Sequence, residues 1–95
     1  MQDDSFDQDV VNLIASCRSL LALEAMSGVD HYLNHGEPEM AFEGLLIELM
    51  KANRLPESFH SIHWEQMARS AGLIDEGGVF DYEIWNKFSV WYADR

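Results

Sequence analysis

Cysteine, proline and long apolar runs are all scarce in this sequence of 95 residues. Cys17 is the only cysteine, so no internal disulfide can form, and a reducing compartment suits the chain best. No apolar run approaches the roughly 18 residues that a membrane-spanning helix requires. The first residues, MQDDSFDQD, are acidic where a secretory signal would be basic and then apolar. These absences predict a cytoplasmic protein that does not bind a membrane.

Basic residues are also rare. Six Lys and Arg stand against seventeen Asp and Glu, and the net charge is -11. No Lys or Arg occurs between Arg18 and Lys51, or between Arg69 and Lys87. We expect the carboxylates of these two stretches to be uncompensated and to form a continuous negative field. Such a surface repels the phosphates of nucleic acids and attracts a cationic partner. The composition therefore argues against direct binding of DNA or RNA.

Apolar residues recur at helical spacing along the whole chain, and no convincing strand pattern is present. The first 35 residues are predicted to be helical, either as one helix or as two with a break near residues 18–20 or 27–28. Pro38 suits the first turn of a helix that runs to about Asn53. Together with the later segments, this pattern predicts a single all-α domain over residues 1–95, a compact bundle of four to five short helices.

The second half of the chain carries two further helical patterns. The first begins at Leu55–Pro56 and ends near Gly72. Residues 73–79 are predicted to form a loop, with a short extended piece at Leu73–Phe80 as an alternative. Asp81 is expected to cap the last helix. That helix has six large apolar residues between positions 82 and 92, more than one core-facing stripe uses.

Candidates for chemistry are few. The histidines form two pairs at helical spacing, His31 with His35 and His60 with His63. A zinc site would need the pairs, or one pair and a carboxylate, to converge. Cys17 falls on an apolar helical face, where a buried thiol is usual. We therefore expect no metal, no cofactor and no enzymatic activity, with a metal- or ligand-binding bundle built on the histidines as an alternative.

One segment resembles a known family. Residues 36–49, GEPEMAFEGLLIEL, resemble the G-E-x-x-x-A-x-E-x-L-x-x-x-L block of small bacterial immunity proteins of the Maf type. A tyrosine-containing stretch (Asp30–Leu33) precedes the block and a helix ending near Gly72–Leu73 follows it, so the resemblance covers residues 30–75. It implies a helical antitoxin, coded beside a secreted toxin domain, that neutralises this toxin by direct binding.

Charge and resemblance lead to one functional prediction. Toxin domains that cut nucleic acids tend to be basic, and an acidic bundle can occlude their substrate-binding surface. We therefore predict an immunity protein, monomeric or a small homo-oligomer, whose partner is a cognate toxin, a basic nuclease domain. A phage-encoded acidic mimic of nucleic acid, inhibiting a defence nuclease or a transcription protein, is the alternative. The predicted contact residues are Asp30, Tyr32, Glu37, Glu39, Glu43, Asp75, Glu76, Asp81 and Tyr92.

Overall fold

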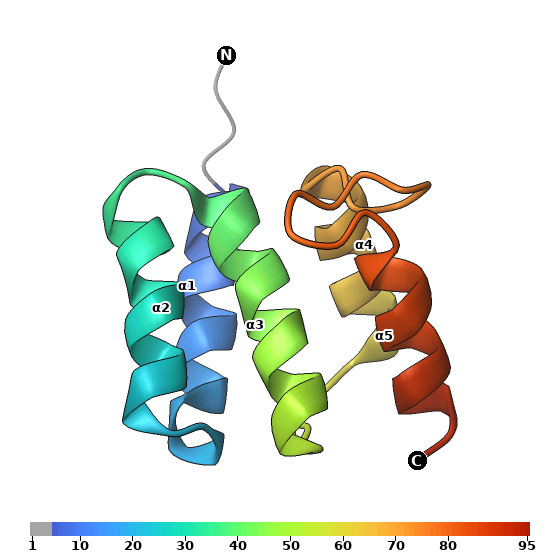
Figure 1. Cartoon of the computed structure of the whole chain (residues 1–95), viewed down its shortest axis with the longest axis horizontal. Helices are drawn as coiled ribbons and strands as arrows, with labels where there is room; N and C mark the ends of the chain where they lie inside the picture. The colour runs from blue at the N-terminus through green and yellow to red at the C-terminus, as the bar shows by residue number, and fades with distance from the viewer. Residues whose placement is uncertain (1–4) are drawn as a thin grey trace.

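The computed structural model describes residues 5–95, and the regular structure of this part of the chain is entirely helical. The helices α1, α3 and α5 run in one direction and α2 and α4 in the other, so the bundle alternates up and down (Figure 1). The predicted all-α bundle is confirmed. No helix within residues 5–95 has both the length and the apolar character needed to cross a bilayer. The elements are α1 (Ser5–Cys17), the 3-10 helix η1 (Arg18–Leu20), α2 (Leu23–Asn34), α3 (Pro38–Ala52), α4 (Ser61–Ser70) and α5 (Ile84–Ala93).

The first part of the chain forms two helices. After η1 the backbone becomes extended, with φ and ψ of -120° and 151° at Leu21 and of -66° and 156° at Ala22. α2 then continues through Ser27 and Gly28 without interruption. The sequence left two positions open for the break. The structure has it at residues 18–20 and not at residues 27–28. The break lets α2 reverse direction and lie antiparallel to α1 (Figure 1).

The central helix is α3, which packs against α1, α2 and α5. Pro38 lies in its first turn. Asn53 ends it in the left-handed conformation (φ 57°, ψ 47°), and the N–H groups of Asn53 and Arg54 donate to the carbonyl oxygens of Met50 and Leu49. The predicted bounds of this helix are confirmed. Its apolar side chains are buried over more than one face: Ala41, Phe42, Leu45, Leu46 and Leu49.

Aromatic side chains join α5 to α4 around Phe88. The rings of Phe88 and Trp64 are nearly parallel, with an interplanar angle of 4° and centroids 5.9 Å apart. The ring centroid of Trp85 lies 5.5 Å from that of Phe88 on the same helix. Each such pair contributes about 0.5–1.5 kcal/mol beyond the burial of its area. The aromatic residues of α5 thus belong to the core or pack against it, and this explains why the helix has more apolar residues than one stripe requires.

The boundaries of α4 and α5 differ from the prediction. α4 begins at Ser61, later than Pro56, and α5 begins at Ile84, later than Asp81. Asp81 does not cap the helix; its Oδ1 accepts the N–H of Glu83 at 3.0 Å and so stabilises a turn that precedes α5. No strand forms within residues 5–95, so the extended piece considered for Leu73–Phe80 is absent. The connection between α4 and α5 is consequently longer than predicted.

Candidate protein-binding surface

The loop between α4 and α5 is held in place by a buried carboxylate. Glu43, in α3, has no exposed surface. Its Oε1 accepts the N–H of Val79 at 2.7 Å, and its Oε2 accepts the N–H groups of Phe80 and Asp81, both at 2.9 Å. Hydrogen bonds to a charged acceptor are among the stronger ones in proteins, and a buried carboxylate without them would be costly. The loop therefore has a fixed position on α3 although it lacks regular structure.

Two glycines permit this close approach. A Cβ at Gly78 would overlap the carbonyl oxygen of Asp81 and lie 2.8 Å from Oε2 of Glu43. A Cβ at Gly77 would overlap the carbonyl oxygen of Gly72. Side chains therefore do not fit at these positions unless the loop rearranges. The glycine pair that predicted a loop is thus required by the packing of the loop backbone.

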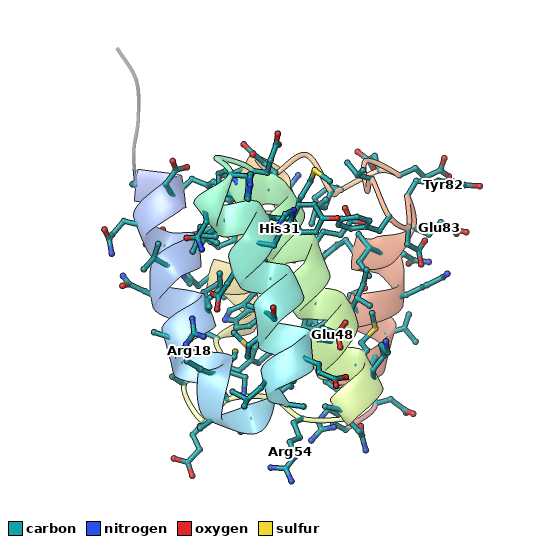
Figure 2. The ribbon with its side chains drawn as sticks, turned by 60° about the vertical axis from the view of Figure 1, so that its left-hand side comes forward. Arg18, His31, Glu48, Arg54, Tyr82 and Glu83 are labelled. Carbon is teal, nitrogen blue, oxygen red and sulfur yellow. The ribbon has the colours of Figure 1, made fainter. Side chains whose placement is uncertain are left out.

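The loop presents three apolar side chains to solvent. Val79, Phe80 and Tyr82 expose 67%, 44% and 57% of their surface. The ring of Phe80 lies against Tyr32 of α2, with centroids 5.3 Å apart, and Tyr82 points away from the helices (Figure 2). Neighbouring exposed apolar side chains on a fixed backbone are typical of protein-binding surfaces. None of these three side chains is among the predicted contact residues. The signal for Val79 and Phe80 in the sequence is an apolar pair directly after Gly77–Gly78.

The loop lies at the end of the bundle where α1, α3 and α5 begin (Figure 1). We call this the acidic end, because the residues here carry eight carboxylates that reach the surface but only two cations, Lys87 near the start of α5 and Arg69 in the last turn of α4. Toward the opposite end lie the other four cations, among them Arg54 (Figure 2), with five carboxylates: Glu24, Asp30, Glu48, Glu57 and Asp94. The negative charge is therefore polarised along the bundle. The eight carboxylates belong to Asp7, Asp9, Glu37, Glu39, Asp75, Glu76, Asp81 and Glu83.

Part of this polarity has a purely structural reason. Three helices begin at the acidic end, and carboxylates in a first turn interact favourably with the helix dipole. Asp7 in α1 and Glu39 in α3 occupy such positions. Asp75 and Glu76 do not, because they lie in the loop with left-handed φ angles of 61° and 69°. The helix dipole thus explains some of the acidic residues but not those of the loop.

Among residues 5–95, four ion pairs reduce the negative charge, so the prediction of uncompensated carboxylates in both stretches is wrong in part. Arg18 donates two hydrogen bonds of 2.9 Å to the oxygens of Asp30, and the guanidinium lowers the pKa of this carboxyl group. Lys87 lies 2.7 Å from Oδ2 of Asp81 and lowers the pKa of Asp81 in the same way. The remaining pairs are Lys51–Glu48 at 3.9 Å and Arg69–Glu65 at 3.1 Å.

Five of the nine predicted contact residues gather at the acidic end. Glu37, Glu39, Asp75 and Glu76 are exposed there, and Asp81 is half-buried. Glu39 lies in the first turn of α3, one turn before the glutamate that holds the loop. Tyr32, half-buried, joins the same surface through its contact with Phe80.

Three predicted contact residues do not belong to this surface. The prediction for Glu43 is wrong, because its carboxylate is buried and binds the loop backbone. Asp30 lies in α2, where it is paired with Arg18 of η1. Tyr92 lies in the last turn of α5, at the opposite end, where its ring is 5.1 Å from that of Phe59. None of these positions could be distinguished from exposed ones by local sequence.

The residues considered for metal or nucleophilic chemistry are not brought together. Within residues 5–95 no group of three or more His, Cys, Asp or Glu side chains is placed to hold a metal ion. His31 and His35 are exposed on α2 with ring centroids 4.3 Å apart, and His35 Nδ1–H donates to the carbonyl oxygen of His31 at 2.7 Å. Burial raises the pKa of the Cys17 thiol from 9.0 to about 11, so this thiol is protonated at neutral pH.

Taken together, the fold and this surface define a class: a small all-helical protein with a fixed, partly apolar loop at an acid-rich end. No protein-family model, no curated protein and no solved structure matches the chain. The function must therefore be inferred from the surface itself.

Proposed function

We propose that this chain binds a basic protein through its acidic end, and that it is an immunity protein whose partner is a bacterial toxin domain. The observation that carries the proposal is the exposed row of Val79, Phe80 and Tyr82, fixed by Glu43 and surrounded by carboxylates. Protein interfaces commonly have this composition, with aromatic anchors at the centre and polar groups at the rim. The carboxylates would select a cationic surface over a neutral one.

The rigidity of the loop supports tight binding. A loop that is already ordered loses little conformational freedom when it binds, so more of the contact energy appears as affinity. The hydrogen bonds from the loop to Glu43 provide this order before the partner arrives. An immunity protein needs such affinity, because the producing cell must silence each toxin molecule before damage occurs.

The charge polarity supports fast capture. Opposite fields on two proteins raise the association rate well above the value for neutral partners. A basic toxin that binds nucleic acid would meet the acidic end first, and the bundle would then cover the surface that holds its substrate. The resemblance of residues 30–75 to Maf-type immunity proteins points to the same partner class.

Co-expression with the product of the neighbouring gene tests this proposal. We expect a basic, toxic protein that copurifies with the chain and loses its toxicity in the complex. If the partner binds but keeps its toxic activity, the chain is a binding protein of another kind, and the immunity function is excluded. Phage genes as neighbours, with capture of a host nuclease or transcription protein, would favour the nucleic-acid mimic instead. Binding through the end that carries Arg54 would contradict the proposed surface.

A further inference from the structure

An apolar groove of about 280 Å³ runs between α2 and α3. Gly28 of α2 and Gly44 of α3 form part of its walls, and Ile47 contributes apolar surface on the α3 side. Phe80 of the loop and Tyr32 of α2 also line the groove, and their ring centroids are 5.3 Å apart. The groove is therefore continuous with the exposed apolar row of the loop. Its volume is almost twice the roughly 150 Å³ of a cavity that admits benzene.

Packing between α2 and α3 does not require the two glycines. A Cβ at Gly28 would have no atom within 4 Å, and a Cβ at Gly44 would lie 3.8 Å from Cγ2 of Val29, an ordinary contact. Both residues are inside helices, where glycine is less favourable than alanine. Glycine is therefore present at two helical positions where it is unfavourable and where the free protein has room for a side chain. The effect of the two glycines is to keep the groove open.

The charge at the groove indicates what could occupy it. Glu48 lines the groove on the lower half of α3, beside α2 (Figure 2), and 28% of its side chain is exposed. Its ion pair with Lys51 is long, with 3.9 Å between Nζ and Oε2. A cation of a partner could approach Glu48 while an apolar side chain beside that cation fills the groove. This combination of an apolar side chain and a flanking cation fits a basic amphipathic helix.

We propose that the groove between α2 and α3 binds an apolar side chain from a lysine- or arginine-rich helix of the partner. This inference rests on the proposed function, because the helix would belong to the basic protein captured at the acidic end. The carboxylates would then bring the partner to the surface, while the groove would select the partner that has an apolar side chain at the matching position.

The binding experiment uses two labelled peptides as probes. One is a lysine-rich amphipathic helix with a single tryptophan, and the other has alanine in place of that tryptophan. We expect the tryptophan peptide to bind about tenfold more tightly, because burial of a large side chain is worth at least that factor. In NMR titrations, its largest amide shifts should fall on Gly28, Gly44 and Phe80.

Matched variants connect this affinity to the groove. Gly28→Met fills the groove and should weaken binding of the tryptophan peptide about tenfold, whereas Ser27→Met adds the same side chain at the next position, outside the groove, and should change it less than about twofold. Gly28→Ala should raise the Tm of the free protein by about 4 °C. A fall in Tm would overturn the inference, because it would show that the free fold needs the glycine.

The remaining outcomes separate this inference from the proposed function. Equal binding of the two peptides, or equal effects of the two methionine variants, would overturn the inference that the groove binds a partner side chain. Neither result would contradict electrostatic capture at the acidic end. An absence of shifts at the groove with the tryptophan peptide in excess would also overturn it. Tryptophan-dependent binding in the groove that is independent of salt would support the groove and count against capture by the acidic end.

Discussion

Glu43 and Phe80 are 37 positions apart in the chain, yet the carboxylate of Glu43 accepts the N–H of Phe80 at 2.9 Å. Two further N–H groups, those of Val79 and Asp81, bind the same carboxylate. Through these bonds the central helix determines where the loop presents its apolar side chains. A residue that looks like part of the charged surface is therefore a positioning residue for the candidate binding surface.

The first prediction concerns Glu43→Gln. The amide NH2 of glutamine would face backbone donors beside a buried side chain, so at least one N–H of the loop would lose its acceptor, and we expect the free energy of unfolding to fall by about 2 kcal/mol. Denaturant unfolding measures this loss, and hydrogen exchange should accelerate at Val79, Phe80 and Asp81. Glu39→Gln, one turn away and exposed, should change stability by no more than about 0.5 kcal/mol. Equal stability of the two variants would show that the loop does not depend on Glu43.

The second prediction concerns Gly78→Ala. The added Cβ would overlap the carbonyl oxygen of Asp81, so the loop has to move away from Glu43. We expect a loss of about 1–3 kcal/mol, which is a fall in Tm of at least about 4 °C for a domain of this size. The same substitution at Gly28 should have the opposite sign, because no atom lies within 4 Å of its Cβ. An unchanged Tm for Gly78→Ala would mean that the loop tolerates a side chain there.

The third prediction concerns the aromatic anchor. Tyr82 is 57% exposed, so Tyr82→Ala should leave the stability within about 0.5 kcal/mol of the parent. If Tyr82 is an anchor, the complex with the copurified partner should dissociate about tenfold faster or more, with little change in association rate. Val90→Ala removes a comparably exposed apolar side chain (63%) from α5 and is the control. Surface plasmon resonance measures both rates, and similar dissociation for the two variants would exclude Tyr82 as an anchor.

The fourth prediction concerns electrostatic steering. Glu39→Lys reverses a charge at the acidic end, and Glu57→Lys makes the same change near the start of α4, at the opposite end. We expect the first variant to slow association several-fold while dissociation changes little, and the second to have a smaller effect. Added salt should slow association of the parent and reduce the difference between the variants. An association rate that does not respond to salt would exclude steering. Glu43→Lys is unsuitable for this test, because it would place a cation against the N–H groups of the loop.

The fifth prediction concerns Cys17. Its pKa is raised from 9.0 to about 11 because the thiol is buried. A folded-state pKa above the unfolded value means that the stability linked to this thiol is complete below pH 9 and is lost as the pH rises toward 11. The free energy of unfolding should therefore fall more steeply over this range in the parent than in Cys17→Ala. At neutral pH a thiol reagent should label Cys17 only after unfolding; rapid labelling of the folded protein would show that the thiol is accessible.

Helix formation could be predicted from the sequence because its signals are local. The apolar period of α3, with Pro38 at its start and Asn53 at its end, determined that helix almost to the residue. The predictions were less accurate for α4 and α5, since Pro56 and Asp81 are also compatible with the turns that precede these helices. The choice between a turn and a helix start depends on contacts with residues far along the chain.

By itself, the sequence determined the all-helical architecture, the large excess of carboxylates and the apolar pair after Gly77–Gly78. Only the tertiary structure decided which carboxylates are available at the surface. Glu43 is buried because α3 lies at the centre of the bundle and is covered over more than one face. Asp30 is paired because the antiparallel arrangement of α1 and α2 brings Arg18 beside it. The physical reason is the same in both cases: hydrogen bonds and ion pairs depend on distance in space, and the folded chain sets that distance independently of separation in the sequence.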